Sequence, residues 1–377
     1  MNFIVSSTGL LSHLQSISRV INSKNTLPIL DNFLFELNNK DLIVTASDLE
    51  TTLNVRIALQ NAEGNGKIAI DAKKLNDIIK EFSEQPLTFN IDNDTLNVEI
   101  VTDRGKYNIK GYNADEFPQI PTIKKDKQFK IELASEVLLN GINKAHFATA
   151  NDDLRPVMNG IYMEINNDFL SFVASDGHKL VRYRRYEINS AEGAAFILPK
   201  KPASLLKNVL TKVQSPVSLE FDDKNAFFSF TDYNMVCRLV EGKYPNYNHV
   251  IPTNNNNKLI VDRVDLLNSI KRASIFANQA SNLVKIKIAG NQLSVSAQDI
   301  DFASSAYEQI NCQYEGEDME IGFKSLFLLE ILSNLSSSDV QMELSDPSRA
   351  GLLMPTEKEV ETEDTLMLLM PMMINNQ

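Results

Sequence analysis

The strongest constraint on the fold of this chain is an internal repeat. The tripeptide Ala46-Ser47-Asp48 recurs later in the chain as Ala174-Ser175-Asp176. At the same spacing, Leu10-Leu11 recurs as Leu138-Leu139 and again as Leu266-Leu267. These matches define three units of roughly 125 residues, a length greater than that of solenoid or propeller repeats. Each unit is large enough to be a small domain with its own core.

The repeat also predicts the domain organisation. We expect three domains, at residues 1–125, 126–254 and 255–377, joined by proline-marked segments that follow Phe117 and Tyr244. A third, weaker copy of the Ser-Asp segment places Asp299 opposite Asp48 and Asp176. Because aspartate side chains accept hydrogen bonds from backbone amides close in sequence, we expect all three carboxylates to hold turns.

Each unit carries two helical patterns separated by alternating strands. Apolar residues recur at a helical period, with Ser7 and Asp262 as expected N-caps of the helices that follow them. Segment 32–37 alternates apolar and polar residues, and turn signals such as Asn65-Gly66 separate the strands. The expected helical segments are 8–24, 71–84, 135–148, 199–214, 262–279 and 323–335. We therefore predict an α+β fold of three tandem repeats, each with two helices packed on antiparallel sheet.

Charge is distributed unevenly between helices and strands. The chain has a net charge of −12, yet the six expected helices carry 14 Lys and Arg against 8 Asp and Glu. One interpretation is a set of scattered, solvated helix faces. The other is a shared basic surface that binds the phosphates of a polyanion without reading its sequence. If the helices line a ring, six would leave a hole of about 9 Å and twelve a hole of about 28 Å. A ring of two copies, with twelve helices, would therefore have a hole wide enough for a DNA duplex.

Several classes of chemistry have no signal in the sequence. We find no glycine-rich phosphate loop and no His or Cys cluster with metal spacing, so no cofactor and no metal is expected. A β-rich hydrolase using His178 with Asp176 is the rival hypothesis, although a triad is normally assembled from distant segments. Two cysteines, Cys237 and Cys312, fit a reducing compartment, and the apolar runs are too short to span a membrane. We expect a cytoplasmic protein.

Several ordered stretches together carry a family resemblance. They are Thr26-Leu27-Pro28-Ile29-Leu30, Ser47-Asp48-Leu49-Glu50, Ala174 through Leu180, Val240 through Tyr247, Met319-Glu320-Ile321-Gly322-Phe323 and Leu369-Met370-Pro371-Met372. On a threefold repeat, this order and spacing resembles the bacterial sliding clamps, the β subunits of DNA polymerase III, over essentially the whole chain. The resemblance implies a non-catalytic processivity factor: a head-to-tail homodimeric ring that encircles duplex DNA and tethers its partners in replication and repair. The partners that the resemblance implies are the replicative polymerase, the clamp loader, and other polymerases and repair proteins.

The resemblance also implies site residues. Partners of the family insert a short apolar peptide into a pocket between the second and third repeats. Carried over, that pocket uses Met158, Ser175, Gly177, His178, Lys179, Leu180, Pro245, His249, Val250, Phe327, Leu368, Leu369, Met370, Pro371 and Met372. Leu and Met would give an adaptable apolar groove, with polar groups at its rim to orient the peptide. The family's DNA contacts correspond to Lys24, Lys73, Lys80, Arg155, Lys200 and Lys201. The dimer edge would bring Tyr107 and Ile109 against Ile275 and Phe276.

Overall fold

The computed structural model describes residues 1–122 and 128–374. It divides into two compact units, one formed by Met1–Leu139 with Ser204–Leu239 and the other by Asn140–Ala203 with Val240–Gln377. The predicted boundary between residues 125 and 126 lies outside the described residues. Among the described residues, no helix is both long enough and apolar enough to cross a membrane.

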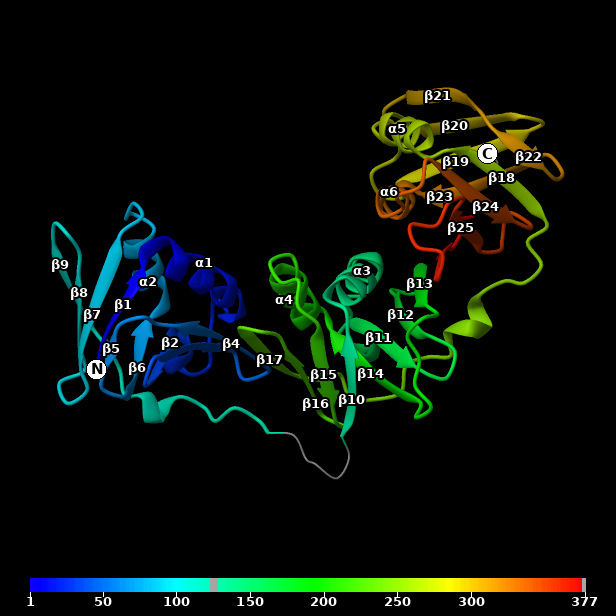
Figure 1. Cartoon of the computed structure of the whole chain (residues 1–377). Coiled ribbons are helices and arrows are strands. Elements are labelled where there is room, and N and C mark those ends of the chain that lie inside the picture. Colours follow the sequence, from blue (N-terminus) through cyan, green and yellow to red (C-terminus); the bar gives the residue numbers. More distant parts are fainter. Residues whose placement is uncertain (123–127, 375–377) are drawn as a thin grey trace. The chain divides into compact units, whose positions relative to one another are not determined.

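Two longer helices occur in each repeat, as the apolar spacing predicts (Figure 1). The α-helices are α1 (Ser7–Ile17), α2 (Ala72–Ile79), α3 (Ser135–His146), α4 (Lys200–Leu210), α5 (Arg263–Ser274) and α6 (Ser325–Ser333). Short 3-10 helices are η1 (Ser18–Val20), η2 (Pro28–Asp31), η3 (Ala114–Glu116), η5 (Pro156–Met158) and η6 (Tyr247–Val250). The inward residues Leu10, Leu14 and Ile17 of α1 are fully buried, and the repeat-equivalent Leu138 and Leu266 are buried as well.

The helix caps follow the chemistry of the residues, with one correction. Asp262 caps α5 as predicted, because its Oδ1 accepts a hydrogen bond from the backbone N–H of Asp265 at 2.8 Å. The predicted cap Ser7 is wrong. Ser6 caps α1 by accepting from the backbone N–H of Gly9 at 3.0 Å, whereas the buried Ser7 hydroxyl donates to the Ser83 carbonyl.

The first unit contains two antiparallel sheets. One has the strand order β5 (Ala62–Glu63), β1 (Asn2–Ser6), β7 (Pro86–Asp92), β8 (Asn97–Val101), β9 (Lys106–Lys110). The other has the order β10 (Phe129–Leu133), β15 (Val217–Phe221), β16 (Asn225–Ser229), β17 (Tyr233–Arg238), β4 (Thr51–Ala58), β3 (Asp41–Ser47), β2 (Asn32–Asn38), β6 (Gly66–Asp71). In this second sheet, β17 of the second repeat pairs with β4 of the first.

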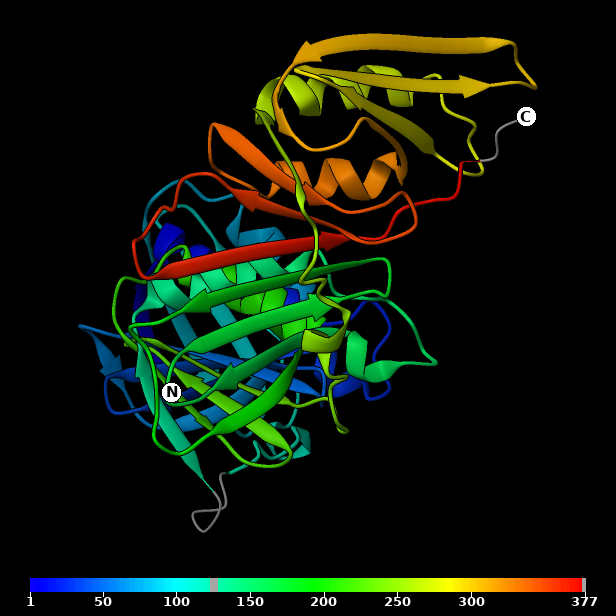
Figure 2. The same ribbon diagram turned by 90° about the vertical axis from the view of Figure 1, so that its right-hand side faces the viewer.

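The second unit contains two further antiparallel sheets. The larger has the order β14 (Ala194–Pro199), β11 (Gly160–Ile165), β12 (Leu170–Ser175), β13 (Lys179–Arg185), β26 (Glu363–Leu369), β25 (Gly351–Pro355), β24 (Asp339–Leu344), β18 (Asn257–Asp262), β22 (Gln313–Glu315). The smaller has the order β21 (Ser304–Asn311), β20 (Gln292–Asp299), β19 (Leu283–Ala289), β23 (Met319–Lys324). Figure 2 shows the red strand β26 of the third repeat lying along the green strand β13 of the second.

The recurring aspartates hold turns, as expected. Oδ1 of Asp48 accepts from the backbone N–H groups of Glu50 and Thr51, at 3.0 and 2.7 Å. Oδ1 of Asp299 accepts from the backbone N–H of Asp301 at 3.0 Å. However, Asp299 pairs across its hairpin with Ser304, the place that Ser47 takes in the first repeat. The third hairpin therefore pairs one residue closer to its turn, while Asp299 keeps the register of Asp48, two residues after a buried alanine.

Candidate functional site

An apolar cavity of about 270 Å³ lies in the second unit, where the second and third repeats meet. Leucine, methionine, valine, proline and tyrosine side chains form most of its wall. Ten predicted residues line it: Met158, Ser175, Gly177, His178, Lys179, Leu180, Pro245, Val250, Leu368 and Met370. The cavity is hereafter called the peptide pocket.

The turn between β12 and β13 forms one wall of the peptide pocket. Oδ1 of Asp176 accepts from the backbone N–H groups of His178 and Lys179, both at 2.9 Å. Gly177 has a φ of 92°, a left-handed conformation that glycine adopts without the steric cost that a side chain brings. The sequence Asp-Gly-His thus folds into a fixed turn that presents the His178 ring at the rim.

The end of the third repeat forms the facing wall. Leu180 of β13 pairs with Leu368 of β26, and both side chains are almost fully buried. One residue past the strand, the backbone N–H of Met370 donates to the carbonyl of His178 at 2.9 Å. Met370 is 43% exposed, so the residue that follows the buried strand supplies an apolar side chain at the surface.

A buried lysine connects the turn to helix α6. The Lys179 ammonium lies 2.7 Å from Oδ2 of Asp176 and 2.9 Å from Oε2 of Glu330. It also lies 4.4 Å from the centre of the Phe327 ring, which stacks on His178 at 5.5 Å. Burial raises the pKa of Asp176, but hydrogen bonds from the Lys179 side chain and the turn backbone outweigh it, and the pKa is lowered overall. The carboxylate therefore stays ionised and the turn stays closed.

Three lining residues were not predicted: Tyr244, Asn246 and Tyr247. Tyr244 stacks on Tyr162 with ring centres 4.8 Å apart, and the Tyr247 hydroxyl donates to Oε2 of Glu164 at 2.8 Å. Burial raises the pKa of the Tyr244 phenol. Both tyrosines belong to the stretch from Val240 to Tyr247, one of the stretches on which the family resemblance rests. The sequence of this stretch did not indicate that its aromatic rings face the cavity.

Five predicted pocket residues lie beside the cavity rather than on its wall. Phe327 stacks on His178, and Leu369 is fully buried. The backbone N–H of Met372 donates to the carbonyl of Gly322 at 2.8 Å, and the half-buried Pro371 precedes it. A ring nitrogen of His249 lies 3.1 Å from Nδ2 of Asn246. His249 and Phe327 therefore border the lining residues, while Leu369 supports them from inside.

The rival hydrolase interpretation is wrong. The Ser175 hydroxyl donates to the Lys179 carbonyl at 2.9 Å, and Asp176 is engaged by the turn and by Lys179. Ser175, Asp176 and His178 therefore form a turn rather than a catalytic triad. Among the described residues, no group of His, Cys, Asp and Glu side chains could hold a metal ion.

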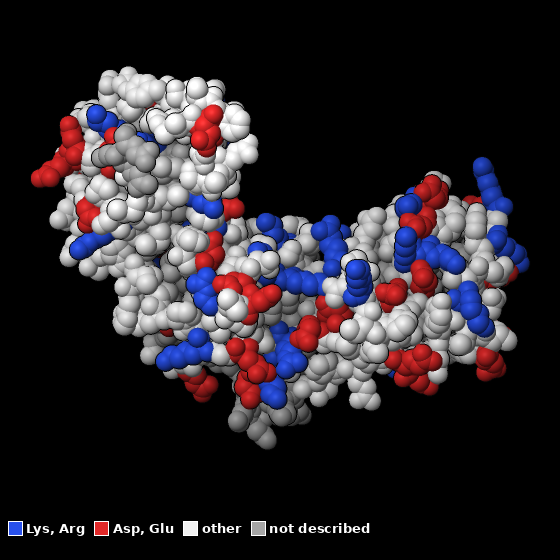
Figure 3. All heavy atoms as spheres, turned by 180° about the vertical axis from the view of Figure 1, so that it is seen from behind, with Lys and Arg blue, Asp and Glu red and all other residues white. Residues whose placement is uncertain are grey.

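The predicted DNA-contacting residues lie on helices or next to them. Lys73 and Lys80 are exposed on and just after α2, and Lys24 is exposed beyond α1. Lys200 and Lys201 are half-buried at the start of α4. The exposed Arg155 precedes η5, and its Nε lies 2.8 Å from Oδ2 of Asp152. On the face seen in Figure 3, basic and acidic side chains are interspersed.

The predicted dimer residues lie at sheet edges and at a helix end. Tyr107 and Ile109 belong to β9, the edge strand of the five-stranded sheet. Tyr107 is half-buried, and its ring packs on Phe82 with centres 5.3 Å apart. Ile275 and Phe276 follow α5 and are 78% and 40% exposed. Large apolar side chains at this exposure are candidates for an interface.

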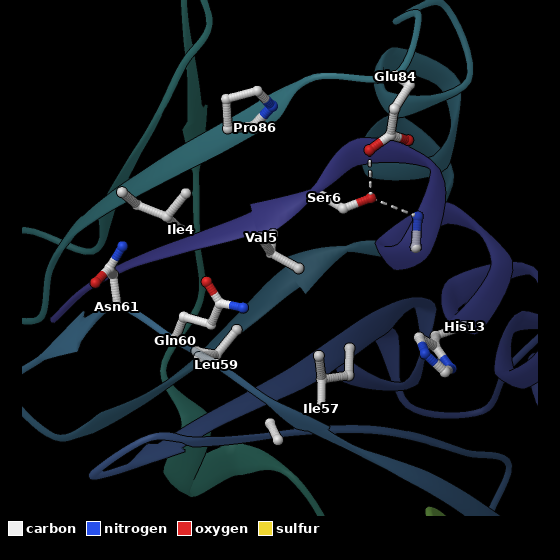
Figure 4. Close-up of a pocket in the computed structure, with 12 residues that line it drawn as sticks. Ile4, Val5, Ser6, His13, Ile57, Leu59, Gln60, Asn61, Glu84 and Pro86 are labelled. Atoms are coloured by element: carbon white, nitrogen blue, oxygen red, sulfur yellow. Dashed lines mark hydrogen bonds between the residues drawn. The ribbon is translucent and has the colours of Figure 1, made fainter.

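A larger cavity, of about 460 Å³, lies within the first repeat and contains none of the predicted residues (Figure 4). Its polar groups hydrogen-bond within the protein. The Ser6 hydroxyl caps α1 and donates to Oε1 of Glu84 at 2.9 Å, and Nδ1 of His13 lies 2.8 Å from the Tyr233 hydroxyl. Burial lowers the pKa of His13, so the ring is favoured as a neutral hydrogen-bonding group. These groups stabilise the start of the fold.

Tandem α+β repeats with an apolar surface pocket are features typical of a binding protein. Comparison with known families agrees. The descriptions "DNA polymerase III beta subunit, N-terminal domain", "central domain" and "C-terminal domain" match residues 1–121, 132–246 and 248–373.

Individual relatives match almost the whole chain. The beta sliding clamp of Pseudomonas putida is 28% identical over 99% of this chain and 100% of its own length. That of Synechocystis is 30% identical over 94% of this chain and 96% of its own. The solved sliding clamp of Pseudomonas aeruginosa bound to griselimycin superposes with a TM-score of 0.94 at 26% identity, covering 99% of this chain and 100% of that one. The chain belongs to the beta subunit family of bacterial DNA polymerase III, the beta sliding clamps. It is a non-catalytic processivity factor of DNA replication, as the resemblance predicted.

Proposed function

We propose that this clamp works as a head-to-tail homodimeric ring that encircles duplex DNA and holds its partners by short peptides in the peptide pocket. Its three domains are residues 1–125, 126–254 and 255–377, and it acts in the cytoplasm, where the buried, unpaired thiols of Cys237 and Cys312 stay reduced. The single observation that carries the proposal is the way in which strands join successive repeats.

Each junction inside the chain uses the same strand pairing. Strand β4 of the first repeat pairs with β17 of the second, and β13 of the second pairs with β26 of the third. In both pairs, the strand after the Ser-Asp turn joins the last long strand of the next repeat. The third repeat's strand after its turn is β21, and the first repeat's last strand is β9. Both are edge strands, which have no neighbouring strand on one side. The edge strand β21 of one protomer can therefore pair with the edge strand β9 of another.

The internal junctions also predict the register of the dimer. Leu53 pairs with Met235, and Val181 pairs with Met367. All four side chains are at most 1% exposed. The equivalent residue of β9 is Tyr107. The equivalent residue of β21 is Ala306, which pairs with the buried Ala297 as Leu53 pairs with the buried Ala46. We pair Ala306 with Tyr107 across the interface of two protomers. Exposed Ile275 and Phe276 then lie at the end of α5, where the neighbouring protomer would cover them.

A cross-linking experiment tests this register. Cysteines introduced as Ala306→Cys and Tyr107→Cys are expected to form an intermolecular disulfide under mild oxidation, since directly opposed strand residues lie within bonding distance. The control pair, Ala306→Cys with Asn108→Cys, points to opposite faces and is expected to remain reduced. Equal cross-linking of both pairs, or none, would contradict the proposed interface.

DNA contact fits the same ring. Lys24, Lys73, Lys80, Arg155, Lys200 and Lys201 come from four separate segments and include no motif for reading bases. Scattered phosphate contacts of this kind bind every sequence similarly and weaken with salt. Such binding suits a ring that slides rather than one that stops at a site.

Partner binding uses the peptide pocket. Its opposing walls come from the second and third repeats, and Tyr244, Leu180 and Met370 offer apolar surface to an inserted peptide. A related solved clamp carries griselimycin. We propose that the replicative polymerase, the clamp loader, other polymerases and repair proteins insert short apolar peptides here, with His249 and Phe327 at the rim.

A further inference from the structure

A second groove lies in the first unit, where the first and second repeats meet. It encloses about 310 Å³ between the turn that follows β3 and the end of β17. The side chains used in the argument are Leu49, Glu50, Thr52, Lys224, Val236 and Arg238. It is hereafter called the acidic-peptide groove, for the ligand argued below.

The backbone of this groove repeats that of the peptide pocket. Thr51 pairs with Cys237 as Lys179 pairs with Leu369. The backbone N–H of Arg238 donates to the carbonyl of Glu50 at 2.8 Å. The matching bond in the peptide pocket, from Met370 to the carbonyl of His178, measures 2.9 Å. The two sites therefore offer an extended ligand the same main-chain frame.

The side chains on this frame differ in chemistry. Glu50 replaces His178, Thr52 replaces Leu180 and Arg238 replaces Met370. An apolar peptide placed here would strip water from a carboxylate and a guanidinium without supplying partners, which is unfavourable. The groove therefore discriminates against the apolar peptides that the peptide pocket accepts.

Leu49 provides an independent sign of a ligand contact. Its φ is 78° where the equivalent Gly177 has 92°, and its side chain is 48% exposed. A left-handed conformation is sterically unfavourable for a residue other than glycine. The fold thus holds an apolar side chain out into solvent, in a strained conformation, beside the charged residues. Strain of this kind is found at ligand contacts.

The charges favour an anionic ligand. Arg238 and the exposed Lys224 supply two cations against the single carboxylate of Glu50. The Arg238 guanidinium lies 3.8 Å from the Glu50 carboxylate, and these side chains are 56% and 63% exposed. Exposed pairs of this type contribute little to stability. A guanidinium that is exposed in this way can bind a ligand carboxylate in a bidentate manner.

We propose that the acidic-peptide groove is a second docking site for partner proteins. Its ligand is an extended peptide in which acidic residues alternate with aliphatic ones. The ligand's carboxylates contact Arg238 and Lys224, and an aliphatic side chain packs on Leu49 and Val236. The site acts independently of the peptide pocket, so one protomer can hold two segments of different chemistry.

Fluorescence anisotropy with the full-length protein tests the site. The probe is a fluorescein-labelled Asp-Leu-Glu-Leu peptide, and the comparison peptide is Asn-Leu-Gln-Leu. We expect the acidic probe to bind and Arg238→Gln to weaken it about tenfold, the effect of losing one charge-assisted contact. Leu49→Gly should weaken it as well. The matched control is Arg349→Gln, which removes another exposed arginine with an acidic neighbour and should leave binding unchanged.

Deletion of residues 370–377 separates this site from the peptide pocket. The deletion should leave the acidic probe bound while an apolar Gln-Leu-aromatic peptide is lost. Failure of the acidic probe to bind, or its loss on the deletion but not in Arg238→Gln, would overturn the inference and leave the peptide pocket unaffected. A single-stranded oligonucleotide that binds through Arg238 when the acidic probe does not would overturn it too.

Discussion

Removing the two exposed apolar residues after α5 should convert the ring into monomers. Ile275 and Phe276 are 78% and 40% exposed in the isolated chain, so most of one side chain and part of the other become buried at an interface. Full burial of such a side chain is worth about 1.5–3 kcal/mol. Scaled by exposure, Ile275→Ala with Phe276→Ala removes about 2 kcal/mol from each interface. A closed dimer has two interfaces, so its dissociation constant should rise roughly 1,000-fold.

Sedimentation equilibrium across a dilution series measures this change. The matched control, Leu154→Ala with Tyr186→Ala, removes side chains that are 92% and 42% exposed elsewhere and should leave the dimer intact. Circular dichroism of both variants checks that each folds. A double variant at Ile275 and Phe276 that sediments as an unchanged dimer would refute the assignment of the interface to this helix end.

Three further outcomes are expected. Replacing Lys24, Lys200 and Lys201 by Ala should weaken duplex binding equally across sequences and flatten its salt dependence, measured by titration at several salt concentrations; a strong sequence preference would contradict non-specific contact. Deleting residues 370–377 should leave the dimer intact but abolish heat of binding of a Gln-Leu-aromatic peptide in calorimetry, whereas unchanged affinity would place the pocket elsewhere. Burial raises the pKa of the Cys237 thiol to about 12, so iodoacetamide at pH 8 should alkylate it only after unfolding, as peptide mapping would show.

Local features of the fold could be predicted from the sequence because they depend on neighbouring residues. The apolar periodicity located all six α-helices of the described residues, and the Ser-Asp repeats located hairpin turns that Asp48 and Asp176 indeed hold. The Ser7 cap was misassigned by one residue because two adjacent serines both satisfy the capping pattern. Asp299 has the register of Asp48, but its hairpin pairs one residue closer to the turn, which the sequence match alone does not indicate.

Strand pairing between repeats could not be predicted, because it joins residues far apart in sequence. Nothing near Leu180 indicates that Leu368 is its partner, yet this pairing places Met370 beside His178 and so creates the peptide pocket. The resemblance supplied most lining residues but not Tyr244 or Tyr247, whose rings reach the cavity through packing on Tyr162. The equivalence between the peptide pocket and the acidic-peptide groove likewise depends on the register of strand pairing between repeats. The alternation of apolar and polar residues alone does not specify that register.

The most direct test of the central claim is topological. The full-length clamp is loaded onto a nicked circular plasmid by its clamp loader with ATP, isolated by gel filtration, and the DNA is then cut once with a restriction enzyme. A closed ring around the duplex should remain on the circle at physiological salt and leave the linear DNA by sliding off its ends. Equal retention on circular and linear DNA would show binding without encirclement and would contradict the ring.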